Sequence, residues 1–118
     1  MIEISASAST ATVTIAGELD LAERAQFSEV TARVSGLRRQ FLVIDMCDVT
    51  FMDSTGAAFL MALADAAAKR GGTAVLRGIS DRELFVLDIC GALSLFRVDA
   101  QHRCGSSARQ DDPRRLNA

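Results

Sequence analysis

The sequence predicts an α/β fold: a single domain with a mixed, mostly parallel sheet of four to five strands and helices packed on it. Short apolar segments with strand character alternate with longer segments of helical periodicity over residues 1–99. The chain length of 118 residues suits one domain, and a hydrophobic fraction of 49% supplies enough apolar material for one core. Helices that join short buried strands favour parallel strand pairs.

The N-terminal part begins with two strands and a helix. Residues 12–16 (TVTIA) alternate β-branched and small side chains and predict a strand, and residues 2–5 predict a weaker strand that pairs with it as a hairpin. We expect Gly17 to interrupt the strand pattern. Asp20 stands where an N-cap is expected, before a helix whose apolar positions recur up to residue 37. Gly36 is expected at the end of this helix.

The middle of the chain predicts the central strand and the second helix. Residues 41–46 (FLVIDM) form a short continuous apolar run, which is typical of a parallel strand buried on both faces. A second short segment, residues 49–52, leads to Asp53 and the following hydroxyl residues. Residues 57–70 then show a wide apolar stripe that predicts a helix, which two glycines end.

The C-terminal part predicts one more strand, one more helix and a final short strand. Residues 73–76 form the strand, and a capping box from Ser80 to Glu83 opens the helix. Residues 95–98 form the last strand. From Ala100 the composition becomes polar and holds the only proline. We therefore expect a domain over residues 1–99 and a flexible polar tail over residues 100–118.

Composition excludes several classes of protein. The net charge of −2 argues against nucleic acid as the main partner, because phosphate-binding domains carry a basic excess. No apolar run approaches the ~20 residues that span a bilayer, and the first residues lack the features of a signal peptide, so we expect a cytoplasmic protein without membrane contact. The chain has one histidine, His102, which argues against a metal site or a Ser-His-Asp triad. No cofactor is predicted.

The three cysteines, Cys47, Cys90 and Cys104, are widely spaced and include no Cys-x-x-Cys pair. The simplest interpretation is three reduced thiols, of which Cys47 and Cys90 are buried and inert. The alternative is a reversible disulfide that changes a partner-binding surface, with Cys104 reaching another cysteine from the tail.

The segment Asp53-Ser54-Thr55-Gly56 lies where a strand gives way to a helix. Ligands collect at the carboxyl ends of strands in open α/β sheets, and the first N–H groups of a helix attract anions. A hydroxyl at this place can cap the helix or accept a phosphoryl group. The spacing alone favours capping and does not decide further.

Two motifs and the apolar strand between them together give the chain a family resemblance. Gly17-Glu18-Leu19-Asp20, then Val43-Ile44-Asp45-Met46, and then Phe51-Met52 before the Asp-Ser-Thr-Gly segment make residues 2–99 resemble the STAS superfamily. Within it, the chain is similar to bacterial anti-sigma-factor antagonists.

The resemblance implies a regulatory binding protein and not an enzyme. In that family a partner that is both an anti-sigma factor and a serine/threonine kinase phosphorylates the second hydroxyl of the motif. The residue that matches it is Thr55, and Ser54 is the second choice. The dephosphorylated protein binds the kinase and frees a sigma factor in a stress response, and a protein phosphatase resets it.

The expected partner-binding surface surrounds Thr55. The small residues after the motif would allow close approach of a partner, and Met61 would offer an adaptable apolar contact or else belong to the core. Two departures from the family pattern are a threonine where serine is common and no amphipathic helix after the last strand. The expected partner-binding residues are Asp20, Asp53, Ser54, Thr55, Gly56, Ala57 and Met61.

Two other functions remain open. The chain resembles a STAS subunit of another complex, such as a transporter or a signalling scaffold, in which Thr55 is never phosphorylated. A nucleotide-binding protein or hydrolase that uses Asp20, Asp53 and Thr55 is disfavoured, because no glycine-rich phosphate-binding motif is present. The sequence predicts no oligomeric state.

Overall fold

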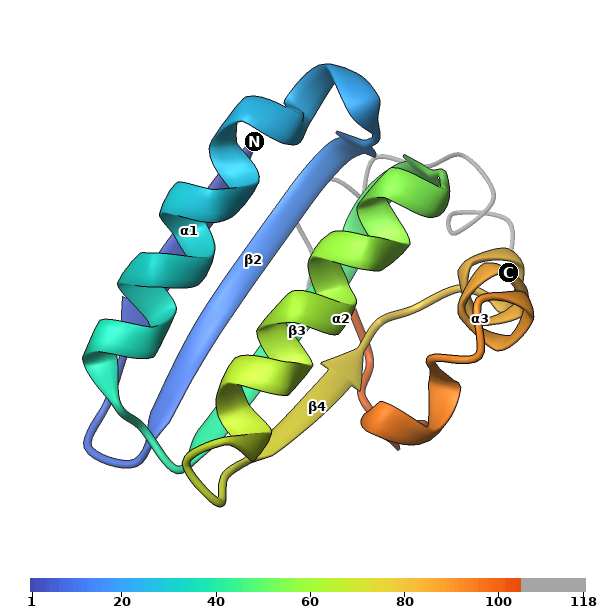
Figure 1. Cartoon of the computed structure of the whole chain (residues 1–118). Coiled ribbons are helices and arrows are strands. Elements are labelled where there is room, and N and C mark those ends of the chain that lie inside the picture. The colour runs from blue at the N-terminus through green and yellow to red at the C-terminus, as the bar shows by residue number, and fades with distance from the viewer. Residues whose placement is uncertain (105–118) are drawn as a thin grey trace.

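The chain folds into one sheet with its two longest helices on one face (Figure 1). The structure is a computed structural model and describes residues 1–104. Two short 3-10 turns precede α1 and β5. The elements in chain order are β1 (Ile2–Ala6), β2 (Thr10–Leu19), η1 (Leu21–Glu23), α1 (Arg24–Leu37), β3 (Phe41–Met52), α2 (Ser54–Ala68), β4 (Thr73–Arg77), α3 (Asp81–Ile89), η2 (Leu93–Leu95) and β5 (Arg97–Asp99).

The sheet has the order β1-β2-β3-β4-β5. Strands β1 and β2 form the expected antiparallel hairpin, in which Ile4 pairs with Val13. The other neighbours are parallel, and their register places Val13, Ile44 and Leu76 in one row across the sheet. The prediction of a single α/β domain with a mixed, mostly parallel sheet is confirmed.

The core lies between the sheet and the pair α1 and α2, which run side by side on the same face (Figure 1). The rings of Phe27 and Phe59 stack with centroids 4.2 Å apart and tie the two helices together. Helix α3 lies apart from this pair, beyond the end of β4 (Figure 1). The largest fully buried side chains are Val13, Ile15, Leu19, Val34, Leu42, Ile44, Met46, Leu60, Leu63, Leu76 and Leu87.

Strand β3 differs from the prediction in two ways. It continues to Met52 and so includes the segment that was expected to be separate. Its side chains alternate between buried and half-covered or exposed, because the helices cover only one face of the sheet, so the expected burial on both faces is wrong. Between Thr14 and Ala16 of β2 the partner in β3 advances from Asp45 to Asp48, which marks a β-bulge.

Several predicted helix ends agree with the structure. Asp20 accepts a hydrogen bond from the N–H of Ala22 at 3.1 Å, but it caps the 3-10 turn η1, and α1 itself begins after Glu23 without a side-chain cap. Ser80 and Glu83 form the predicted capping box. Asp53 caps α2, as described below. The expectation for Gly36 is wrong: α1 continues to Leu37, and Arg38 takes the left-handed conformation with φ 55°.

The first residues after β5 are held against the domain. The Asp99 carboxylate accepts hydrogen bonds from the N–H groups of Gln101 and His102, both at 3.1 Å. Cys104 forms a disulfide with Cys47. The remainder of the expected polar tail, residues 105–118, lies outside the described residues. Within residues 1–104 no helix has both the length and the apolar character that crossing a membrane requires.

Candidate functional site

The Asp53-Ser54-Thr55-Gly56 segment forms the first turn of α2. Asp53 has an extended backbone (φ −107°, ψ −171°), and its Oδ1 accepts the N–H of Gly56 at 3.0 Å. Asp53 is therefore the N-cap, as the local spacing favoured. In the described part of the chain the hydroxyls of Ser54 and Thr55 make no hydrogen bond to protein groups; Ser54 is exposed and Thr55 half-buried. The cap leaves both hydroxyls available for chemistry.

The loop after β2 joins this turn. Leu19 pairs with Met52 at the ends of the parallel strands, and the N–H of Asp53 donates to the Leu19 carbonyl oxygen at 3.3 Å. The second carboxylate oxygen of Asp53 accepts the N–H of Leu21 at 3.4 Å. The two motifs of the sequence, ending at Asp20 and beginning at Asp53, thus form one surface with two half-buried carboxylates.

Gly56 and Ala57 do not belong to this surface, contrary to expectation. Both are buried in the domain itself. A Cβ at Gly56 would collide with the carbonyl oxygen of Leu19 and would lie 2.9 Å from the Cγ atoms of Leu19 and Met52. The small side chains therefore let α2 approach the ends of β2 and β3, and the close contact that they allow is internal.

Met61 is half-buried and packs against the core. Its contact with a partner stays a prediction. The outer side of α2 continues from Ser54 through Ala58 to Ala62, which are exposed and small. This row leaves a smooth helix surface beside Met61 that begins at the hydroxyls.

Two exposed apolar side chains lie next to the two motifs in the sequence, and neither was expected there. Leu21, directly after Asp20, is 61% exposed, and Phe51, two residues before Asp53, is 46% exposed. Single exposed apolar side chains are common on protein surfaces, so the interest of these two lies in their place beside Asp20 and Asp53. Their position next to Asp20 and Asp53 was visible in the sequence, but their exposure depends on the bulged end of β3 and on the 3-10 turn.

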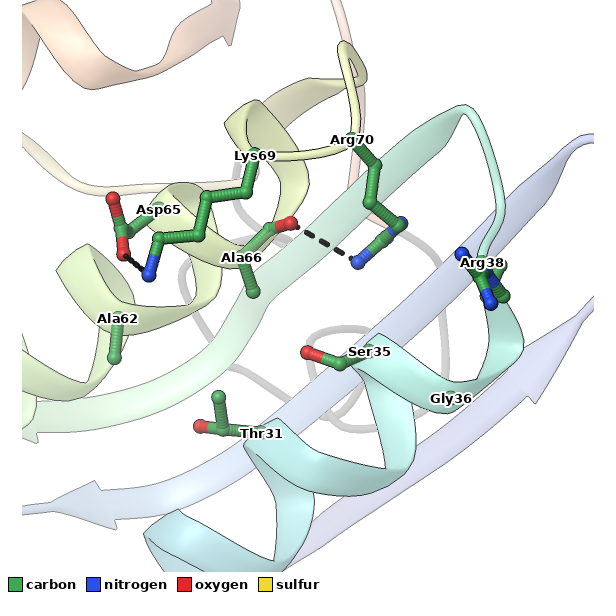
Figure 2. Close-up of a pocket in the computed structure, with 9 residues that line it drawn as sticks. All are labelled: Thr31, Ser35, Gly36, Arg38, Ala62, Asp65, Ala66, Lys69 and Arg70. Atoms are coloured by element: carbon green, nitrogen blue, oxygen red, sulfur yellow. Dashed lines mark hydrogen bonds and ion pairs between the residues drawn. The ribbon is translucent and has the colours of Figure 1, made fainter.

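A groove between α1 and α2 lies at the opposite end of α2 (Figure 2). Two basic side chains of this groove interact with the last turns of α2. Lys69 pairs with Asp65 at 3.2 Å, and Arg70 donates to the Ala66 carbonyl oxygen at 3.0 Å. Because a helix rises by 1.5 Å per residue, Lys69 lies about 20 Å along the axis from Thr55. The groove is therefore separate from the Asp53–Gly56 turn.

The cysteines differ from the simplest interpretation. Cys47 is buried but is bonded to Cys104, so the two do not exist as separate reduced thiols in this structure. Cys90 is the free cysteine of the described residues, and it is exposed, because it follows the last residue of α3 and points away from the core.

The chain belongs to the STAS domain family, whose model matches residues 1–103. No curated protein sequence matches it. The domain covers nearly all of the described residues, and its start and end coincide with β1 and the turn after β5.

Solved structures with the same fold include SpoIIAA, an anti-sigma factor antagonist, and RsbS. The Bacillus cell fate determinant SpoIIAA in its phosphorylated form is 16% identical, with a TM-score of 0.66, over 86% of this chain and 93% of that chain. A serine-to-glutamate variant of RsbS from Moorella thermoacetica is 20% identical, with a TM-score of 0.70, over 98% and 97%.

A third structure with this fold comes from a transporter family protein. The sulfate transporter family protein from Wolinella succinogenes is 24% identical, with a TM-score of 0.57, over 75% of each chain. At these sequence identities the similarities establish the fold only. The function has to be argued from the residues of the site.

Proposed function

We propose that this protein is an anti-sigma-factor antagonist in the bacterial cytoplasm. It binds an anti-sigma factor with serine/threonine kinase activity through the start of α2, and phosphorylation of Thr55 switches this binding off. The observation that carries the proposal is the first turn of α2, where two unbonded hydroxyls lie beside the loop that holds Asp20 and the exposed Leu21. The likeness to phosphorylated SpoIIAA supports it.

The binding surface for this partner consists of Asp20, Leu21, Phe51, Asp53, Ser54 and Thr55. The apolar side chains of Leu21 and Phe51 supply contact area that a partner can bury. The carboxylates and hydroxyls make polar contacts that fix the orientation of the partner. This role requires no catalytic group in the chain itself, because the kinase is the partner and a separate phosphatase removes the phosphate.

Phosphorylation of Thr55 changes the charge of this surface and leaves the fold in place. A phosphothreonine carries about −1.5 to −2 charges, and the N-terminus of a helix accommodates an anion. The backbone bonds of the turn run through Asp53 and not through the hydroxyls. A partner shaped for a neutral hydroxyl would instead bury an unpaired charge beside two carboxylates, which costs several kcal/mol.

The direct test is phosphorylation of the full chain by a candidate kinase from the same organism. We expect ATP-dependent addition of one phosphoryl group, located on Thr55 by tandem mass spectrometry and lost in Thr55→Ala. Ser54→Ala and the nearby exposed Thr50→Ala serve as matched controls and should be modified as the wild type is. Modification that persists in Thr55→Ala, or that depends on Ser54, would assign the switch to another hydroxyl.

The second candidate function is a STAS subunit of a transporter-type complex, which the likeness to the sulfate transporter family protein favours. The same end of α2 would then dock on a larger partner without phosphorylation. The phosphorylation experiment separates the two functions, because this alternative predicts no kinase-dependent change in mass.

A further inference from the structure

A cluster of three metal-ligating side chains lies near the bulge of β3. Cys47 is buried in the bulge, and His102 and Cys104 follow β5. One ligand atom from each lies within 4.8 Å of the other two. The Cα atoms of Cys47 and Cys104 are 5.5 Å apart, although 57 positions separate them in the sequence.

Hydrogen bonds fix the backbone on both sides of the cluster. Asp45 accepts the N–H of Cys47 at 2.9 Å with one carboxylate oxygen and pairs with Arg77 Nε at 3.0 Å with the other. Asp99 accepts the N–H groups of Gln101 and His102 in the turn that leads to Cys104. These bonds hold the ligand-bearing residues in place without using their side chains.

Gly78 makes the space that the two sulfur atoms occupy. Its φ is +71°, and a Cβ there would collide with the Sγ of Cys47 and lie 2.9 Å from the Sγ of Cys104. A side chain at this position would therefore fill the pocket that holds the sulfurs.

His102 has a buried side-chain nitrogen that is not satisfied. Its Nε2 is inaccessible to solvent and has no hydrogen-bond partner among the described residues. A buried polar atom without a partner costs about 1–3 kcal/mol. If Nε2 is the imidazole nitrogen that faces the two sulfurs, a metal ion between them would supply the missing partner.

We propose that Cys47, His102 and Cys104 form a binding site for Zn²⁺ or a similar ion when the disulfide is reduced. The ligands would be two thiolates and one neutral imidazole, which leaves a fourth tetrahedral position for water or another ligand. The charges of the ion and the two thiolates cancel, which suits a half-buried place. The inference does not depend on the proposed function.

The chemistry requires a dithiol or phosphine reductant. The reductant transfers two electrons to the Cys47–Cys104 disulfide and is itself oxidised. The two sulfurs take up two protons and become thiols. Metal binding then releases those two protons, because thiolates are the ligands. Two sulfurs at about 2.3 Å from one tetrahedral ion lie roughly 3.8 Å apart, so only side-chain rotation is needed from the present backbone.

The disulfide and the metal site exclude each other, because both use the same two sulfur atoms. Either one joins the bulge of β3 to the end of the domain. The sequence argued against a metal site, since it has one histidine and no closely spaced cysteine pair. The fold brings the three residues together.

The test uses the full chain, reduced with a phosphine under anaerobic conditions and titrated with Co²⁺ and then with Zn²⁺. We expect one equivalent of Co²⁺ to give the visible bands of a tetrahedral site and a thiolate-to-cobalt charge-transfer band, and Zn²⁺ to displace it. The oxidised protein should give neither signal, because its sulfurs are bonded to each other.

Variants assign the ligands. Cys104→Ser should lose the charge-transfer intensity of one thiolate and most of the affinity, and His102→Asn should weaken Zn²⁺ binding by at least roughly 10–100-fold, the loss typical of disturbing a metal site. Cys90→Ser is the matched control and should bind as the wild type does. Circular dichroism verifies that each variant is folded.

Three results would overturn the proposal: an unchanged cobalt spectrum in Cys104→Ser, binding that is lost in Cys90→Ser, or equal binding by the oxidised protein. If Cys47→Ser does not fold, Cys104→Ser and His102→Asn still decide, because both residues lie beyond the last strand.

Discussion

Strand β3 is tied to the rest of the molecule at two points that are held in different ways. At its end, Asp53 accepts hydrogen bonds from the N–H groups of Leu21, which directly follows the first motif, and of Gly56, which closes the second. At its bulge, Cys47 is joined to Cys104, 57 positions away. The first point leaves hydroxyls free on an exposed turn, and the second encloses sulfur atoms in a pocket. We expect a change of charge on the hydroxyls at the first point to leave the fold in place, and loss of the bond at the second point to destabilise it.

The largest predicted effect on stability concerns the Cys47–Cys104 bond. Chain-entropy reasoning for a loop with a separation of 57 residues gives a stabilisation of about 4 kcal/mol, within the usual range of about 2–5 kcal/mol. Cys104→Ser should lower the free energy of unfolding by this amount relative to the oxidised wild type, as measured by urea denaturation without reductant. Cys90→Ser should be unchanged. Equal stability of Cys104→Ser and the wild type would show that the bond contributes little.

The next effect is at Gly56, where the start of α2 approaches β2. The added methyl group of Gly56→Ala would collide with the Leu19 backbone, so we expect a loss of about 1–3 kcal/mol or more. Urea denaturation measures it. Gly36→Ala is the matched control within α1, because its Cβ would meet no atom within 4 Å, and it should stabilise by about 0.5–1 kcal/mol. Similar losses in both variants would refute the steric explanation.

A smaller effect is expected for the cap itself. Asp53→Ala removes an N-cap and the contact with Leu21, and it should cost about 1–2 kcal/mol in thermal or urea unfolding. Asp53→Asn keeps a capping oxygen and should lose less than half of that amount. If Asn were as destabilising as Ala, the carboxylate charge rather than the cap would be the stabilising feature.

The contact at the end of β3, around Asp53, could be predicted from the sequence. The contact at the bulge, between Cys47 and Cys104, could not. Hydrophobic periodicity located the three α-helices and the first four strands, whereas the last strand begins at Arg97 because a 3-10 turn includes Leu95. The caps Asp20, Asp53 and Ser80 stood where local chemistry requires an oxygen. The same reasoning could not foresee that β3 bulges near Cys47 or that α1 continues to Leu37, because neighbouring strands and packing decide these.

The candidate site also has features that the sequence predicted and features that it did not. The motifs identified Asp20 and Thr55, but burial of Gly56 and Ala57 and exposure of Leu21 and Phe51 required the packed structure. The proximity of the cysteines and His102 depends on the path of the chain after β5, and nothing in their spacing indicates it.

The most direct test of the central claim is the effect of Thr55→Glu on partner binding and on the fold. The account predicts a native circular dichroism spectrum, a stability change within about 0.5 kcal/mol, and at least about 100-fold weaker binding to the anti-sigma kinase by calorimetry, or about 2.7 kcal/mol. Thr55→Ala should bind as the unmodified protein does. Thr50→Glu places the same charge on an exposed residue of β3 and should weaken binding much less. Wild-type affinity in a folded Thr55→Glu, or an equal loss in Thr50→Glu, would contradict the account.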